Sequence, residues 1–366
     1  MFGRIKTIVC GIIMALNIVV TVSMLAVGYS DRLNPETYPM LSGVGLVFPL
    51  FVIADIIFIV IWIVLRPKYA VLPVTGLILC YLPVRTYCPL NIRRDIPAGA
   101  LKVVSFNAAG FDTRRYPRGD DGIHPAAAFI RDMDADIVCL QEAPVNDALR
   151  RYLDDTYPYI DTTGVKNGSS LALLSKYPVV GKQHIEYASA GNLSAAFLVV
   201  IDGDTVTVVN NHFETSGLSL DDRAGFSSIM HDAKDNIDHG HMPADTVRQE
   251  SLRLFAKLGE SARKRAPQAR AVAAFVSDRR GKSIILCGDF NDTPISYTHH
   301  TVGRDLTDCY AEGANGPGWT FVQNSMRVRI DNIMCSEHWQ TCRCLTDRSR
   351  TVSDHFPVVA WLTRRQ

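Results

Sequence analysis

The chain has 366 residues, a formal net charge of +1 at pH 7 and 47% hydrophobic residues. This length allows one large domain with an additional module, or two ordinary domains. The balanced charge excludes a strongly basic nucleic-acid-binding protein and an acidic tail, and the hydrophobic excess lies almost entirely in the first quarter of the chain.

Three apolar segments in this first quarter predict a transmembrane region. Residues 7–30 include no charged side chain and are long enough to cross a bilayer as a helix, whereas the apolar core of a cleaved signal peptide is shorter. A second segment covers residues 38–65. A third, at residues 69–87, contains two prolines and predicts either a short kinked span or a re-entrant segment. We therefore expect residues 1–96 to form about three transmembrane helices.

The basic residues near these segments predict their orientation. Arg4 and Lys6 precede the first segment, and Arg66 and Lys68 follow the second, which favours a cytoplasmic N-terminus. Three spans would then place the remaining chain outside the cytoplasm, as the extracytoplasmic part of a multi-pass inner-membrane protein. The basic run at residues 85–94 opposes this orientation, but the first helices usually dominate.

Asp55 is the one acidic residue within the second apolar segment. Intramembrane carboxylates are costly, so a transport function carried by the helices is one hypothesis. Since the segments offer no second intramembrane charge to pair with it, we expect Asp55 to lie near a helix–helix contact or to be protonated.

After residue 97 the chain alternates short apolar runs with polar loops, which is typical of β-strands. The strand-like runs are 101–110, 135–143, 170–180, 195–215, 282–292, 329–336 and 356–363. The turn at residues 202–204 predicts an antiparallel hairpin. Helices are expected at 125–133, 143–153, 245–262 or beyond, and 268–279, and the polar stretch 215–242 is expected to be an extended loop near the site. This mixture predicts an α/β fold with two packed sheets flanked by helices.

Polar residues suited to metal or phosphate chemistry fall at the ends of these strands, where functional residues concentrate. They are Asn107, Glu142, Asn210, Asn211, His212, Asp289, Asn291, Asp331, Asp354 and His355. Carboxylate and amide oxygens without a Cys or His cluster suit a hard cation, Mg²⁺ with Mn²⁺ as a possible substitute, and not zinc. Each motif alone is also explained by a cap or a turn, but their ordered conjunction favours phosphoryl chemistry.

The same motifs resemble those of the endonuclease/exonuclease/phosphatase superfamily. They are SFN (105–107), LQE (140–142), NNHF (210–213), GDFND (288–292), RID (329–331) and SDH (353–355). The resemblance covers roughly residues 100–364, and the preceding apolar segments are similar to those of bacterial membrane-anchored members. It implies a four-layered α/β sandwich, two packed mixed β-sheets flanked by helices, and a catalytic domain at residues 97–366.

The resemblance also implies a metal site. Glu142 matches the principal metal ligand, Asn107 matches the amide that helps position metal or water, and Asp354 matches a further metal-site residue. Some family members carry an acidic residue where this chain has Ala109, so one ligand of those members is missing here.

The catalytic residues implied by the resemblance come from the remaining motifs. Asp289 and Asn291 match the pair that orients the nucleophilic water and steadies the phosphate. His212 matches a phosphate contact or proton donor, although its neighbours differ from the usual Thr-His-Leu. His355 matches the second histidine and Asp331 its carboxylate partner. We assign removal of the proton jointly to His355 and Asp289.

We therefore expect a membrane-anchored, Mg²⁺-dependent hydrolase of a phosphodiester or phosphomonoester, acting by metal-assisted attack of water. Its expected partners are the lipid bilayer and a phosphate-ester substrate, either a lipid headgroup or a nucleic acid. Tethering at a membrane favours the lipid. Basic runs at residues 114–118 and 263–265 either belong to a solvated surface or bind a nucleic acid. The alternatives are a nuclease acting on DNA or RNA and a non-catalytic membrane protein that retains the fold.

Overall fold

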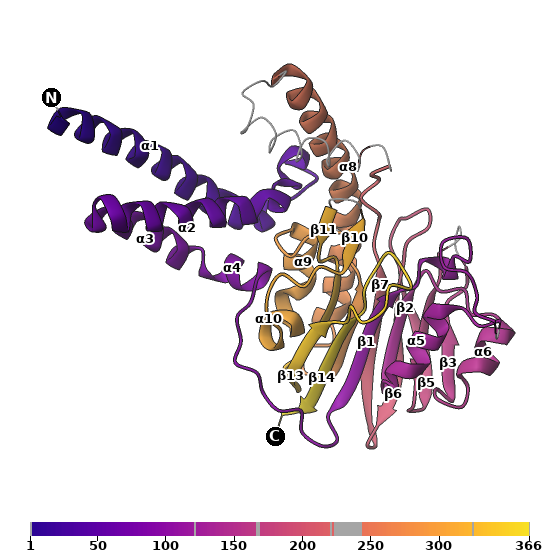
Figure 1. Cartoon of the computed structure of the whole chain (residues 1–366). Coiled ribbons are helices and arrows are strands. Elements are labelled where there is room, and N and C mark those ends of the chain that lie inside the picture. Colours follow the sequence, from indigo (N-terminus) through magenta and orange to yellow (C-terminus); the bar gives the residue numbers. More distant parts are fainter. Residues whose placement is uncertain are drawn as a thin grey trace.

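The computed structural model describes residues 2–120, 122–165, 169–219, 222, 244–323 and 326–365. Two six-stranded sheets with helices on their outer faces follow a group of N-terminal helices that extends away from them (Figure 1). The predicted fold class, an α/β sandwich of two mixed sheets after an apolar helical region, is confirmed. The boundary between residues 96 and 97 stays a prediction, and the first strand begins at Leu101.

The N-terminal region consists of apolar helices. They are α1 (Phe2–Gly28), α2 (Phe48–Leu65), α3 (Val71–Leu79) and α4 (Tyr81–Tyr87), with short 3-10 turns η1 (Ser30–Arg32), η2 (Pro39–Leu41), η3 (Val44–Val47) and η4 (Pro67–Ala70). Two helical stretches, Ile5–Arg32 and Pro39–Leu65, are long and apolar enough to cross a membrane. The third segment is bent by 63° between α3 and α4, where the two prolines predicted a kink. Either a broken span or a re-entrant segment fits this bend.

Asp55 lies at the contact between α1 and α2, as expected from the sequence. Its Oδ1 accepts hydrogen bonds from Asn17 Nδ2 at 3.1 Å and from Thr21 Oγ1 at 2.8 Å. Trp62 Nε1 on α2 donates to Asn17 Oδ1 at 2.9 Å and extends this polar network. Because both neighbours on α1 are uncharged donors, the carboxylate joins the two helices without an opposite charge.

The linker between α1 and α2 packs closely against the following domain. A Cβ on Gly45 would lie 2.0 Å from the carbonyl oxygen of Ile295, and a Cβ on Gly259 would lie 2.3 Å from that of Pro39. Only glycine permits backbones to approach this closely. An ion pair between Arg270 and Glu36, with Nη1 and Oε2 2.7 Å apart, adds to the same contact. The N-terminal region is therefore packed onto the domain at this linker.

The first sheet has the strand order β13-β14-β1-β2-β4-β3 and is mixed, since β1 pairs parallel to β2 and antiparallel to β14. Its strands are β1 (Leu101–Asn107), β2 (Ile137–Gln141), β3 (Tyr159–Thr162), β4 (Leu171–Ser175), β13 (Trp339–Thr346) and β14 (Val358–Arg364). Helices α5 (Pro125–Met133) and α6 (Asp147–Leu153) cover its outer face, and η5 (Ala109–Phe111) follows β1.

The second sheet has the order β5-β6-β7-β8-β12-β9, with β7 parallel to β8. Its strands are β5 (Val179–Ile185), β6 (Leu193–Ile201), β7 (Asp204–His212), β8 (Ile284–Asp289), β9 (Thr307–Asp308) and β12 (Asp331–Cys335). Its outer face packs against α8 (Ala244–Ser277), near α9 (Tyr297–Val302) and η6 (Gly303–Asp305). A small hairpin, β10 (Phe321–Gln323) and β11 (Met326–Val328), and helix α10 (Cys309–Gly313) complete the described elements.

Alternating side chains on each strand separate the inner core from the outer one. On β1, Val103 packs between the two sheets together with Phe197 and Ile285, whereas Val104 packs outward against α5. This period of two is that of a strand buried on both faces. The predicted hairpin at residues 202–204 joins β6 to β7, with the positive φ of 53° at Asp202 and 85° at Gly203 that a tight turn needs.

Three of the expected helices differ from the structure in detail. The separate helices expected at 245–262 and 268–279 form one helix, α8, which continues through Pro267. Proline removes one backbone hydrogen bond, but Val272 and Val276 beyond it are buried against the second sheet, and this packing outweighs the loss. The helix expected at 143–153 begins at Asp147, because Asn146 caps it through a hydrogen bond from the Leu149 amide.

Candidate active site

The strand registers bring the predicted motifs to one end of the two sheets. Asn107, the last residue of β1, lies opposite Gln141 at the end of the parallel strand β2. On the second sheet His212 lies opposite Asp289 at the ends of parallel strands β7 and β8. Asp331 begins β12 directly opposite Asp289, since this pair of strands is antiparallel. Motifs far apart in sequence therefore meet because the ends of their strands are adjacent.

Asn107 connects the carboxylates of the two sheets. Its Nδ2 donates to Glu142 Oε1 at 3.0 Å and to Asp289 Oδ2 at 3.1 Å, while its Oδ1 accepts from the Ala109 amide at 3.0 Å. The amide is buried, so these bonds fix its orientation. One side chain thus holds two carboxylates, one from each sheet, close together.

Two site residues have the left-handed backbone conformation that L-amino acids rarely adopt. The φ angles are 48° at Glu142 and 51° at Asn291, each just beyond the end of a strand. The Asn291 amide donates to Asp289 Oδ1 at 2.8 Å, and its side chain donates to the carbonyl oxygen of Phe213 at 3.0 Å. Such strain concentrates at functional sites and persists where the surroundings fix it, as these hydrogen bonds do here.

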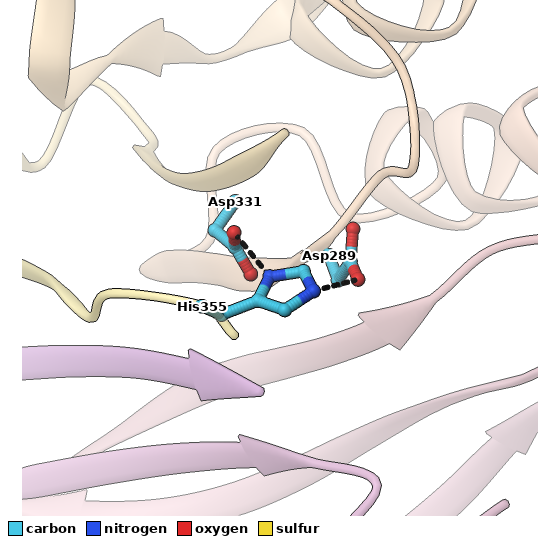
Figure 2. Close-up of side chains that lie close together, drawn as sticks. All are labelled: Asp289, Asp331 and His355. Carbon is cyan, nitrogen blue, oxygen red and sulfur yellow. Dashed lines mark hydrogen bonds and ion pairs between the residues drawn. The ribbon is translucent and has the colours of Figure 1, made fainter. Parts of the chain in front are cut away.

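His355 lies between two buried aspartates (Figure 2). Its Nδ1 is 2.9 Å from Asp331 Oδ2, and its Nε2 is 3.8 Å from Asp289 Oδ2. Thr320 Oγ1 accepts a hydrogen bond from the Asp331 amide, and the Phe321 ring packs edge-on against the imidazole at 5.1 Å between centroids. The other carboxylate oxygen of Asp331 is buried and has no hydrogen-bond partner among the described residues.

Burial and neighbouring charge shift the pKa values of this cluster. Burial raises the pKa of Asp289 to about 6, with a further contribution from the negative charge of Asp331, and His355 and His212 partly oppose this. For His355, burial disfavours the protonated form, but the carboxylates of Asp331, Asp289 and Asp354 outweigh it and raise its pKa to about 10. In the metal-free chain the imidazole is therefore protonated at neutral pH and neutralises part of the acidic cluster.

His212 and Asp354 complete the polar part of the site. Nε2 of His212 is 3.5 Å from Glu142 Oε1, and its Nδ1 is 3.0 Å from Ser169 Oγ. Asp354 is half-buried and has the guanidinium of Arg115 3.8 Å away. The contacts of Ser169 and Arg115 were not predicted from the sequence, since neither residue belongs to a strand-end motif.

These side chains surround a pocket of about 290 Å³. Eight residues were assigned a metal or catalytic role from the sequence. Six of them line the pocket: Glu142, His212, Asp289, Asn291, Asp354 and His355. Asn107 and Asp331 lie beneath them, 1% exposed each, and act through their hydrogen bonds. The opposite wall of the pocket is apolar and includes Leu46 of the N-terminal region, which the sequence did not predict.

A buried ion pair at the pocket was also missed. Arg265 on α8 is 2% exposed, and its Nη2 and Nε lie 3.1 and 3.2 Å from Asp292 Oδ2. The interpretation of the basic run 263–265 as a solvated helix face is therefore wrong for Arg265, although Arg263 and Lys264 are exposed. The sequence feature that could have indicated this ion pair is Asp292, the final aspartate of the GDFND motif, because a buried carboxylate needs a partner.

Among the side chains of the site, the carboxylates are better ligands for a hard cation than the histidine is. One ligand atom each of Asp289, Asp331 and His355 lies within 4.8 Å of the others. However, the two imidazole nitrogens face the two aspartates in opposite directions, and Nδ1 is engaged by Asp331. Glu142 and Asp289, brought together by Asn107, offer only oxygen atoms to the pocket, as Mg²⁺ prefers.

Comparison with known proteins identifies the class of this site. A sequence profile of the Endonuclease/Exonuclease/phosphatase family matches residues 104–355. The chain belongs to this family, whose named activities are hydrolyses of phosphoric esters. A profile for a domain of unknown function matches residues 10–87. A search of the curated proteins found no match.

The solved structures similar to this chain are distant in sequence. The endonuclease/exonuclease/phosphatase of Bacteroides vulgatus aligns with a TM-score of 0.51 and 19% identity over 72% of this chain and 99% of its own. Sphingomyelinase C of Streptomyces griseocarneus gives 0.47 and 19%, over 72% and 99%. The mannosyl-6-phosphatase of Bacteroides thetaiotaomicron gives 0.45 and 19%, over 72% and 100%. At this identity the first structure supports the fold.

Proposed function

We propose that the chain is a membrane-anchored, Mg²⁺-dependent phosphoesterase that hydrolyses a phosphodiester or phosphomonoester by attack of water. The observation that carries this proposal is the convergence of Glu142, Asp289 and His355, from separate motifs and both sheets, on one pocket. Two apolar helices long enough to cross a membrane precede the domain and would anchor it.

We assign the metal site to the carboxylates of Glu142 and Asp354, with Asn107 helping to position the metal. Asn107 Nδ2 donates one hydrogen bond to Glu142 Oε1 and another to the neighbouring carboxylate of Asp289. When bound, Mg²⁺ would neutralise charge on the non-bridging phosphate oxygens and favour ionisation of the attacking water. Loss of either ligand carboxylate would therefore weaken both metal binding and turnover.

Proton transfer is assigned to Asp289 and His355 jointly, because Nε2 of the imidazole faces the Asp289 carboxylate across 3.8 Å. Asp331 holds the imidazole through Nδ1 and so keeps Nε2 directed at Asp289. Asn291 fixes the opposite oxygen of Asp289 through its backbone amide. His212 lines the pocket next to Glu142 and is placed to contact a phosphate oxygen or to protonate the leaving oxygen.

The test uses the full chain in lipid nanodiscs, with Mg²⁺ or with EDTA. The substrates are single- and double-stranded DNA, RNA, phospholipids and a chromogenic phosphodiester without a hydrocarbon chain. We expect turnover that EDTA and Glu142→Ala abolish, and that His355→Ala abolishes while Mg²⁺ binding, measured by calorimetry, persists.

The same assay distinguishes the alternative functions. Turnover of DNA or RNA in preference to lipid would favour the nuclease. Absence of both turnover and Mg²⁺ binding would favour a non-catalytic protein that retains the fold. Undiminished turnover by Glu142→Ala or His355→Ala would refute the assigned mechanism.

A further inference from the structure

The apolar wall of the active-site pocket continues into a second cavity. The wall consists of Leu46, Leu218, Leu258, Phe321, Met326, Val328 and Ile330. A neighbouring cavity of about 480 Å³ lies between α2 and the β10–β11 hairpin. Leu46, Met326 and Val328 line both cavities, so the second begins where the wall of the first ends. Met326 is unbranched and flexible, which makes this boundary easy to displace.

The second cavity reaches the exposed apolar surface of α2. Its far wall includes Leu50, Ile53 and Ile56, whose exposed fractions are 50%, 54% and 48%. They belong to a helical stretch that is long and apolar enough to cross a bilayer. Large apolar side chains exposed to this extent on such a helix face lipid. The two cavities together, called the groove below, therefore lie between the carboxylates and the exposed apolar face of α2, with Leu46, Met326 and Val328 forming the boundary between them.

The polar end of the groove has the composition of a membrane interface. Arg327 is the charged residue among the described residues that line the second cavity, and its guanidinium lies 5.3 Å from the centre of the Trp319 ring. Arg348 lies 5.4 Å from the same ring. Tryptophan flanked by arginine is typical of the headgroup level of a bilayer, where arginine also attracts anionic phosphate.

We propose that this groove takes the hydrocarbon chain of a bilayer lipid whose phosphate ester lies at Glu142 and Asp289. The substrate class is thus an amphiphilic phosphoester drawn from the membrane, and the inference rests on the proposed function. The lining that the second cavity shares with the active-site pocket and the exposed apolar wall on α2 argue for a lipid chain as the occupant. A nucleic acid or a soluble phosphoester would have no contact for these apolar side chains.

The first test compares two substrates and two matched variants in the full chain. The substrates are a chromogenic phosphodiester without a hydrocarbon chain and the same ester carrying an octyl chain, with Mg²⁺ present. Ile53→Trp fills the cavity, whereas Ile57→Trp makes the same change on the same helix at a residue that is 53% exposed and outside its lining. We expect Ile53→Trp to lower the ratio of kcat/KM for the octyl ester to that for the chain-free ester at least tenfold.

Ile57→Trp should leave this ratio unchanged, and Leu50→Trp provides a second filled cavity if Ile53→Trp does not fold. An equal ratio in all variants would overturn the proposed groove while leaving the phosphoesterase intact. A kcat/KM for DNA or RNA above that for the octyl ester would also overturn it.

The second test does not depend on turnover. Vesicles of phosphatidylcholine and phosphatidylglycerol would carry a phospholipid with a photoreactive diazirine at the end of its chain. We expect crosslinking to residues 326–328 of the catalytic domain, reduced in Ile53→Trp and retained in Ile57→Trp. Crosslinking there without EDTA-sensitive turnover would support the groove and refute the proposed enzyme, whereas labelling confined to the N-terminal helices would refute the groove.

Discussion

Asp289 and Asp331 lie directly opposite each other on antiparallel strands, and both are 1% exposed. Two carboxylates at adjacent positions repel each other when both are ionised. His355 lies between them and contacts both, so the positive charge of a single imidazole offsets the repulsion between the two carboxylates. The three residues therefore act as one acid–base unit, and a change in any one alters the protonation of the others.

Loss of the Asp331 charge should lower turnover without removing the metal. Asp331→Asn keeps the shape of the side chain but no longer stabilises a charged imidazole, so we expect kcat to fall by about 10²- to 10⁴-fold. Mg²⁺ affinity, measured by calorimetry, should change little because Glu142 and Asp354 remain. A matching loss of Mg²⁺ affinity would place Asp331 among the metal ligands instead.

The protonation of His355 gives a prediction for the metal-free chain. Because its pKa is raised to about 10, its contribution to stability is fully present below the ordinary histidine value of about 6.5 and is lost as the pH rises through 10. Asp331→Asn removes the adjacent negative charge and should lower this pKa. NMR titration of the imidazole in EDTA measures both values. A midpoint below pH 7 in the unsubstituted chain would contradict the assignment.

The negative charge of Glu142 should contribute to metal affinity. Glu142→Gln keeps the hydrogen bond to Asn107 but removes the charge, so Mg²⁺ affinity should fall by at least about tenfold, the effect of losing about 1.4 kcal/mol. Glu186→Gln, at an exposed position on the same domain, is the matched control and should bind Mg²⁺ normally. Calorimetry on the full chain in nanodiscs provides the measurement. Equal affinities in the two variants would remove Glu142 from the site.

Asp55 should stabilise the helices and have no part in catalysis. Asp55→Ala removes the acceptor of the Asn17 and Thr21 hydrogen bonds, and a loss of about 1 kcal/mol in the free energy of unfolding is expected. Asp55→Asn retains an oxygen acceptor and should lose less. Unfolding in detergent measures both. If Asp55→Ala instead abolishes turnover of the chain-free ester, the hypothesis that the helices carry the function gains support.

The close approach at Gly45 should determine how firmly the N-terminal region docks. Gly45→Ala would place a methyl group against the Ile295 carbonyl and weaken the contact by about 1–3 kcal/mol. Gly11→Ala on α1, which meets nothing within 4 Å, is the control. Hydrogen exchange of the amides in residues 39–47 should accelerate in the first variant alone. Unchanged exchange would mean that the linker is held by its other contacts.

Local patterns explain why much of the fold was predictable. Strands β1, β2 and β8 are short apolar runs that end in polar residues, β12 is one that begins with Asp331, and α5 matches its predicted bounds. Strands β3 and β13 were missed, since Tyr159–Thr162 is short and Trp339–Thr346 mixes polar and apolar residues without clear alternation. The continuity of α8 through Pro267 depends on burial against the second sheet, which a single segment does not reveal.

The candidate site was predictable to the extent that it lies at strand ends. Asn107, Glu142 and His355 were placed by motif, and the structure brings them together. The hydrogen bond between Ser169 and His212 and the ion pair of Arg265 with Asp292 join separate loops or elements, so no sequence spacing predicts them. The apolar wall was missed for the same reason, because it includes Leu46 from a segment treated only as an anchor.

The contribution of Ser42, Gly43 and Leu46 to the pocket wall means that the N-terminal region is not interchangeable. A domain grafted onto an unrelated membrane helix would keep its acid–base residues and lose one side of its pocket. Exchange of anchors between relatives should therefore succeed only when the linker and β10–β11 are exchanged together. The N-terminal region and the domain would in this sense have to change together, because each supplies part of the same pocket wall.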